Sequence, residues 1–193
     1  MKISVILGHQ RPGSFNHAIA RTVCQTLRDN GHEVVFHDLY LERFDPVLPD
    51  WEIKAAEEDL PEEIRWHMRE VREADGLVFV HPNWWGGPPA ILRGWLDRVV
   101  RQGFAYRFTE KGPQGNFTEK SVVVFSTSNT PRDVEINVYG DPVGVFWKTI
   151  VFGLCGCKSF ERRNFEPIIL STPPQRGEWL AEVADIVRAG FIP

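Results

Sequence analysis

Short apolar runs alternate along this chain with longer stretches whose apolar residues recur every three or four positions. The first run spans residues 3–7, and the clearest spans 76–80. Runs of this length with little polar alternation are typical of strands buried on both faces of a parallel sheet. Residues 33–37 and 121–125 are further strands of this kind, and the more polar segment 158–165 suits a sheet edge.

The stretches between the strands carry the period of amphipathic helices. Ser14 is a favourable N-cap, apolar residues recur at spacing four from Phe15 to Leu27, and Gly31 is a suitable stop. Residues 38–60 have a loop composition, with a short helix expected within 51–59. A row of charges at 93, 97 and 101 indicates a solvated helix face. Four further helices are expected to begin at or near Pro61, Pro89, Pro142 and Pro173.

Strand and helix alternate five times without an internal linker or repeat. This alternation predicts an α/β fold, a doubly wound five-stranded parallel sheet of order 2-1-3-4-5 with helices on both faces. We expect residues 1–193 to form a single domain. Ligands of such sheets bind beyond the carboxyl ends of the strands around the switch in strand order. The chemistry is therefore expected in the loops after Leu7, Val80 and Phe125.

Composition narrows the function classes. The chain has 193 residues, 42% hydrophobic and 25% charged, as in ordinary globular proteins, and its net charge of −4 argues against nucleic acid as a partner. We expect neither a membrane span nor a secretory leader, because the apolar runs are too short. Three cysteines, Cys24, Cys155 and Cys157, suit a reducing cytoplasm and are expected to be structural. No metal site is expected.

The loop after the first strand runs from Gly8 to Asn16 and enters a helix. Free backbone N–H groups and the positive end of the helix dipole make such a loop an anion site. Ser14 and Asn16 add side-chain donors, and His9 and Arg11 could add charge. The loop matches neither a Walker motif nor G-x-G-x-x-G. An ordinary capped helix explains it about as well as phosphate binding does.

The loop after the third strand contains two adjacent tryptophans, Trp84 and Trp85, followed by Gly86 and Gly87. Glycines let a backbone approach a ligand closely, and indole rings suit a flat aromatic partner with hydrogen-bonding edges. The alternative is that the two rings plug the end of the sheet. The position at the expected binding edge favours the ligand.

The loop after the fourth strand, Ser126-Thr127-Ser128-Asn129-Thr130-Pro131, offers hydroxyl, amide and backbone donors. By itself it could be an ordinary turn. We interpret it as part of a binding site because three such loops are expected at the same edge of the sheet.

Several short motifs occur in one register and together cover roughly residues 2 to 155. They are Ser14-Phe15-Asn16, Asp38-Leu39-Tyr40, Phe44-Asp45-Pro46, Pro82-x-x-Trp85, the run from Pro89 to Val99, and Gly103-Phe104-Ala105-Tyr106. With these motifs the chain resembles the DT-diaphorase-like NAD(P)H:quinone oxidoreductases, the NAD(P)H dehydrogenases with a flavodoxin-like fold.

The resemblance implies a flavin bound by the three loops, FAD in our interpretation and FMN as the alternative. It assigns His9, Phe15 and Asn16 to the phosphates and ribityl end, with Ser14 in the same motif. It assigns the borders of the isoalloxazine ring to two stretches. These are Pro82, Asn83, Trp84, Trp85 and Gly86 in one loop and Ser126, Thr127, Ser128 and Asn129 in the other.

The chain departs from the family's pattern at two positions. Thr-Thr-Gly-Gly is replaced by residues 126–129, and Ile-His-Gly-Asp by Val138-Tyr139-Gly140-Asp141, so a tyrosine stands where the family has its active-site histidine. Tyr139 is either a neutral hydrogen-bond donor that supports flavin reduction or a packing residue.

The resemblance implies ping-pong hydride transfer from NAD(P)H to a quinone or a similar electrophile. Trp85, Asn129 and Tyr139 are expected in the catalytic pocket. Tyr106 and Phe108 are expected to reach the pocket from the second subunit of a homodimer. Two rivals remain. One is a flavodoxin-type electron carrier, which the modest net charge disfavours. The other is a regulatory subunit of a potassium-efflux system with a membrane-transporter partner.

Overall fold

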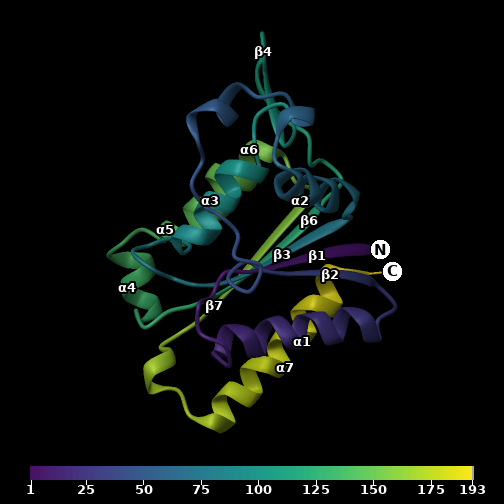
Figure 1. Ribbon diagram of the computed structural model, residues 1–193. Coiled ribbons are helices and arrows are strands. Elements are labelled where there is room, and N and C mark those ends of the chain that lie inside the picture. The colour runs from purple at the N-terminus through teal and green to yellow at the C-terminus, as the bar shows by residue number, and fades with distance from the viewer. Residues whose placement is uncertain (193) are drawn as a thin grey trace.

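Five parallel strands form the centre of the molecule in a computed structural model that describes residues 1–192 (Figure 1). The sheet has the order β2-β1-β3-β6-β7, and β4 and β5 pair separately. The expected order 2-1-3-4-5 is therefore confirmed, as are the α/β class and the edge position of the last strand. The strands are β1 (Lys2–Leu7), β2 (Glu33–Asp38), β3 (Gly76–Pro82), β6 (Ser121–Thr127) and β7 (Ser159–Phe165).

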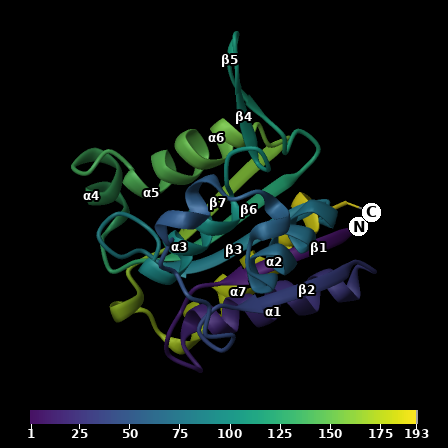
Figure 2. The same cartoon turned by 45° about the horizontal axis from the view of Figure 1, so that its top comes forward.

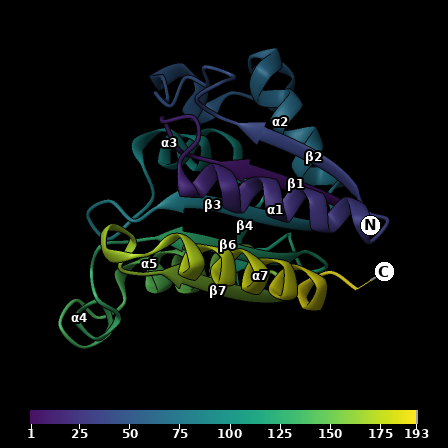
Figure 3. The same cartoon turned by 90° about the horizontal axis from the view of Figure 1, so that it is seen from below.

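Helices cover both faces of the sheet (Figures 1 and 3). Two helices, α1 (Phe15–Asp29) and α7 (Pro173–Gly190), lie side by side on one face. On the other face lie α2 (Glu62–Glu73), α3 (Ala90–Val99) and a helical run made of α5 (Pro142–Gly144) and α6 (Phe152–Cys155) with a π-helix between them.

Each central strand supplies two cores. Side chains alternate across a strand, so Val78 and Val80 pack toward α1 and α7, whereas Leu77 and Phe79 pack toward α2 and α3. All four are completely buried. The unbroken apolar runs of the sequence thus reflect a sheet covered on both sides.

Local signals mark both ends of α1, and a backbone turn ends α3. Ser14 caps α1 by accepting a hydrogen bond from the His17 N–H, and Gly31 follows the helix with φ +79°. The helix α3 ends at Val99, because the chain turns at Val100 (φ −89°, ψ 61°). Gly103, with φ +86°, lies in the next turn.

The helix expected from Pro142 toward Leu154 is present but not uniform. Residues Val145–Val151 form a π-helix that joins α5 to α6. The side chain of Trp147 in this segment is completely buried and donates its indole N–H to His81 Nε2 on β3 at 2.9 Å. Wide helical turns of this kind are frequent at functional sites.

Several short elements lie outside the expected alternation. An antiparallel hairpin of β4 (Tyr106–Thr109) and β5 (Gly112–Gly115) projects from the body (Figures 1 and 2). The short helix α4 (Arg132–Asn137) follows the loop after β6. Short 3-10 helices occur at Asp50–Lys54, Glu57–Asp59 and Ile168–Leu170, the first two within the expected loop. Among residues 1–192, no helix combines the length and apolar character that a membrane crossing requires.

Candidate functional site

The three loops singled out in the sequence meet at the carboxyl edge of the sheet. The Gly8 N–H donates to the Val80 carbonyl at 2.9 Å, and the Asn83 N–H donates to the Thr127 carbonyl at 2.7 Å. The first and third loops are joined directly, because the Asn16 side-chain amide donates to Thr127 Oγ1 at 2.9 Å. The topology therefore brings residues from distant parts of the chain into one site.

The first loop has one polar atom available for a ligand in a buried setting. Asn16 is 3% exposed, and its Oδ1 has no hydrogen-bond partner. The hydroxyl of Ser14 is occupied by the helix cap and by the ring of His17 at 2.9 Å. His9 is half-buried, and its Nδ1 accepts the Arg11 N–H at 3.1 Å. Burial, followed by repulsion from His17 and Arg11, lowers the pKa of His9.

The ring of Phe15 packs against other aromatic side chains of the protein and is not available to contact a ligand. Its centroid lies 6.1 Å from that of Phe165 and 5.9 Å from that of Trp179. The side chain therefore fastens the start of α1 to α7. Any contact of this residue with a phosphate would come from its backbone, which lies at the helix N-terminus.

The second loop closes in a tight turn with an indole ring at its tip. Trp84 and Gly87 exchange backbone hydrogen bonds at 2.9 and 3.1 Å, and both central residues have positive φ, 54° at Trp85 and 74° at Gly86. A tryptophan with positive φ is uncommon. The side chain of Trp85 is fully exposed and that of Trp84 is 41% exposed. The alternative that these rings plug the sheet is therefore excluded for Trp85.

The hydroxyl groups of the third loop hold the loop itself. Ser126 Oγ donates to Asn164 Oδ1 at 2.8 Å, and Ser128 Oγ accepts the Thr130 N–H at 3.0 Å. Asn129 is exposed, and its Oδ1 accepts the Ile169 N–H at 2.9 Å. The side chain of Asn129 thus ties this loop to the turn at Ile168–Leu170.

A pocket of about 430 Å³ opens beside the second loop. Tyr139, 59% exposed, and Trp85 both line it, as does Thr130, whereas Asn129 does not. The complete lining is Asn83, Trp85, Gly86, Thr130, Glu135, Tyr139 and Pro142.

Glu135 belongs to this pocket although the sequence did not single it out. Its side chain is 3% exposed, and Asn83 Nδ2 lies 3.1 Å from each carboxylate oxygen. Burial raises the pKa of this carboxyl. The acidic residue lies in α4, a helix of six residues that carries too weak a pattern to be expected. Pro131, a suitable helix start, was the available signal.

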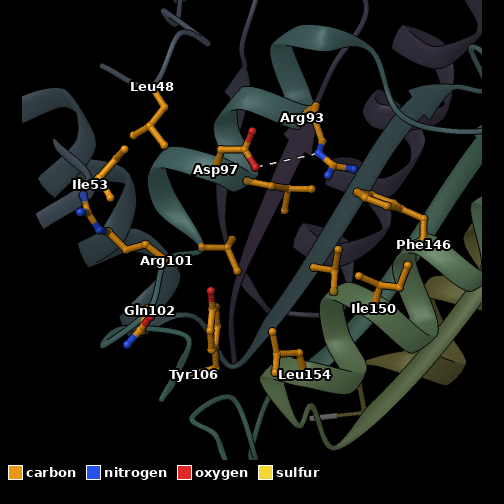
Figure 4. A pocket seen from close by; sticks show the side chains of 13 residues that line it. Leu48, Ile53, Arg93, Asp97, Arg101, Gln102, Tyr106, Phe146, Ile150 and Leu154 are labelled. Atoms are coloured by element: carbon orange, nitrogen blue, oxygen red, sulfur yellow. Dashed lines mark ion pairs between the residues drawn. The ribbon is translucent and has the colours of Figure 1, made fainter. Parts of the chain in front are cut away.

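A second, apolar pocket of about 380 Å³ lies between α3, the π-helix and the segment that precedes α2 (Figure 4). Tyr106 from β4 lines it, and Phe108 stands on the same strand, 62% exposed, with ring centroids 5.8 Å apart. Arg93 and Asp97, which form a 3.9 Å ion pair, and Arg101 line the pocket as well. Arg93 and Asp97 are solvent-exposed, as expected for a solvated helix face, and they form one rim of this pocket.

The described cysteines are free thiols. Burial raises the pKa of Cys155 to about 12 and that of Cys24 to about 11. Thiols of this kind are protonated at neutral pH and therefore unreactive. The structural interpretation of Cys155 agrees with this environment.

Comparison with known proteins places this geometry in a family. Residues 1–184 match the family described as Flavodoxin-like fold. The chain is 40% identical over 161 residues to an uncharacterized NAD(P)H oxidoreductase of Haemophilus influenzae. The aligned region covers 81% of this chain and 79% of the relative. This chain belongs to the flavodoxin-like family of NAD(P)H oxidoreductases. The family member NAD(P)H dehydrogenase [quinone] 1 of Cavia porcellus is 30% identical over 199 residues, 92% of this chain and 72% of that protein.

Solved structures of the flavodoxin-like family agree in shape. Smu.1420 from Streptococcus mutans UA159 has a TM-score of 0.86 and 33% identity, covering 98% of this chain and all of that one. An FMN-dependent NADH-azoreductase from Bacillus anthracis, solved in complex with FMN, has a TM-score of 0.79. At 14% identity, over 98% of this chain and 99% of that one, the azoreductase shows the fold alone. The alternative of a membrane-transporter partner finds no support in the fold or in these relatives.

The residues at the three loops fit the flavin that the family implies. Asn16 offers a buried oxygen without a partner, and Trp85 presents a whole indole face to solvent. Gly13 lies in the first loop with φ +76° and open space where a side chain would stand. The helix N-terminus, the open backbone and the exposed aromatic ring match the phosphate, ribityl and ring portions of a flavin.

Proposed function

We propose that this protein is a flavin-dependent NAD(P)H:quinone oxidoreductase with FAD as its cofactor and FMN as the alternative. The observation that carries the proposal is the meeting of three loops at one sheet edge, with a fully exposed tryptophan in one loop and a buried amide oxygen without a partner in another. An indole left in water forgoes about 1.5–3 kcal/mol that its burial would contribute. The reaction class is supported by the names of the relatives.

The chain's own contribution is to bind and orient, because a bound flavin supplies the hydride chemistry. We assign Trp85 to the wall against which the planar substrates lie. NAD(P)H and the quinone use this one pocket in turn, so the reaction follows ping-pong kinetics. The roles proposed for His9, Ser14, Phe15 and Asn16 are to hold the phosphate and ribityl end, with Pro82–Gly86 and Ser126–Asn129 bordering the ring.

Tyr139 has the role of a hydrogen-bond donor in the pocket, through its hydroxyl group. It lies just after α4 and lines the pocket together with residues of the second loop. We assign Asn129 a positioning role, because its amide oxygen fixes the third loop to Ile169.

The active assembly is a homodimer with two-fold symmetry. An apolar pocket on the α3 face, rimmed by the exposed side chains of Leu48, Ile53 and Ile150, matches an interface between two copies. In this assembly Tyr106 and Phe108 extend the pocket of the other subunit. We further propose that the chain is one domain and acts in the cytoplasm, where free thiols persist.

One set of measurements on the purified protein tests the proposal. Flavin absorbance in a one-to-one ratio is expected, and heat release followed by chromatography separates FAD from FMN. Initial rates with NADH and NADPH against a quinone panel should give the parallel double-reciprocal lines of ping-pong turnover. A protein that takes up neither flavin, or that holds flavin but reduces no quinone, contradicts the proposal.

A further inference from the structure

Three side chains capable of binding a metal converge on the α2 side of the sheet, apart from the three loops. His37 lies near the end of β2, Glu42 lies in the turn that follows, and His67 lies on α2. One ligand atom from each lies within 4.8 Å of the others. The imidazoles are almost completely buried, 1% and 0% exposed, whereas the side chain of Glu42 is 22% exposed. The cluster is thus closed on two sides and open at the carboxylate.

Polar atoms in this cluster lack partners. His37 Nδ1 lies 3.0 Å from Glu42 Oε1, which satisfies one pair. His37 Nε2, Glu42 Oε2 and His67 Nε2 are buried and have no hydrogen-bond partner. The last two face one another at 3.8 Å, too far apart for a hydrogen bond. Buried polar atoms are rarely left unpaired, so three in one place point to a missing ligand.

We propose that His37, Glu42 and His67 bind a divalent transition-metal ion, for which Zn²⁺ is the best match. Two imidazoles and one carboxylate are a ligand set that Zn²⁺ uses, whereas Ca²⁺ and Mg²⁺ require mainly oxygen ligands. A water molecule on the exposed side of Glu42 completes a tetrahedral site. The expectation of no metal is revised accordingly.

Binding requires the cluster to contract, by at most about 1.5 Å for any pair of ligand atoms, since all lie within 4.8 Å of one another. Ligand atoms about 2.0–2.1 Å from a tetrahedral Zn²⁺ lie roughly 3.3–3.4 Å from one another. The pair of Glu42 Oε2 and His67 Nε2, at 3.8 Å, needs to close by less than an ångström. Glu42 can supply that movement, because it lies in a turn and its side chain reaches the surface.

The hydrogen bond between Trp95 and His67 disfavours metal binding, and the resulting loss of affinity can be estimated. Its indole N–H donates to His67 Nδ1 at 3.2 Å, which places the His67 proton on Nε2 in the metal-free protein. Coordination through Nε2 moves that proton to Nδ1, so the Trp95 N–H and the His67 Nδ1–H then face each other and the buried indole loses its acceptor. A buried donor without an acceptor costs about 1–3 kcal/mol, roughly 5- to 150-fold in an equilibrium constant, and structural Zn²⁺ binding exceeds that by several orders of magnitude.

The bound ion would act as a clamp. It links the end of β2 and the following turn to α2, and so restrains the start of the long segment between them. The three ligands come from β2, the following turn and α2. His67 lies far from the other two in the sequence, so the spacing does not match a short metal-binding motif. The site is independent of the proposed oxidoreductase activity, because none of its ligands belongs to the three loops.

Zinc binding to the flavin-loaded protein tests the site. We expect one Zn²⁺ per chain by atomic emission after dialysis, a Kd of micromolar or tighter by calorimetry, and a higher Tm with Zn²⁺ present. Glu42→Gln keeps the side-chain shape and should weaken binding at least tenfold and abolish the Tm increase. His37→Asn should do the same, which covers the case that one variant folds poorly.

Glu33→Gln is the matched control, because Glu33 lies on the same strand and its side chain is 70% exposed. It should bind Zn²⁺ like the unchanged protein. A Kd weaker than about 100 μM in the unchanged protein overturns the proposal. So does stoichiometric binding that survives both Glu42→Gln and His37→Asn, since the ion would then sit elsewhere, for instance at Cys155 and Cys157.

Discussion

A buried ion pair fastens the segment before α2 onto α3. Arg98 Nη2 donates to Glu52 Oε1 at 2.5 Å, and its Nε donates to Glu52 Oε2 at 3.1 Å. The two side chains are 6% and 0% exposed. Arg98 also donates to the Asp45 carbonyl at 2.7 Å, and Arg101 donates to the backbone carbonyl of Glu52. The pair therefore holds the stretch that presents Leu48 and Ile53 to the apolar pocket.

Replacing either partner with an apolar residue should lower the free energy of unfolding substantially, because the other charge stays buried without a counter-ion. Glu52→Leu leaves a buried guanidinium without its anion, a change that costs about 3–5 kcal/mol. For a chain of this size each kcal/mol lowers Tm by about 2–4 °C, so we expect a decrease of roughly 6–20 °C. Arg98→Met should cost a similar amount. The double variant should lose much less than the sum, because neither charge then remains buried.

Urea denaturation, followed by circular dichroism and by tryptophan fluorescence, measures these differences as shifts in midpoint at constant slope. The control is Arg93→Met, which removes an exposed cation from the same helix and should change stability by less than about 1 kcal/mol. Single variants that cost under about 1 kcal/mol would refute the reasoning. Strict additivity in the double variant would also refute it, since additivity means that the two charges do not depend on each other.

Three further outcomes are expected. Tyr139→Phe should slow flavin reduction by NAD(P)H about tenfold in stopped flow, the equivalent of about 1.4 kcal/mol, and an unchanged rate would make Tyr139 a packing residue. Tyr106→Ala should raise the KM for quinone, and a fully active monomer in light scattering would exclude its role across the subunit boundary. His81 is buried, and burial lowers its pKa from 6.5 to about 4. Because the pKa of His81 is lower in the folded than in the unfolded chain, its neutral form costs the folded state nothing above pH 6.5. As the pH falls from 6.5 toward 4, the free energy of unfolding should decrease by up to about 3 kcal/mol. Urea denaturation at a series of pH values should show a smaller decrease for His81→Asn.

The sequence by itself determined the sheet and the edge at which the three loops meet. Periods of two and 3.6 residues and the Ser14 cap are local properties, and local properties specify strands, helices and their order. Parallel connections then leave few arrangements, so the meeting of the loops after β1, β3 and β6 followed from the order of elements alone.

The tertiary structure decided which atoms face the site. The amide oxygen of Asn129 accepts the Ile169 N–H, whereas Glu135, which no sequence motif indicated, lies beside Asn83 in the pocket. Trp147 of the π-helix meets His81 of β3, and His37, Glu42 and His67 meet where α2 packs beside β2. These contacts join residues far apart in the chain. Their geometry is set by packing, which no local pattern of residues encodes.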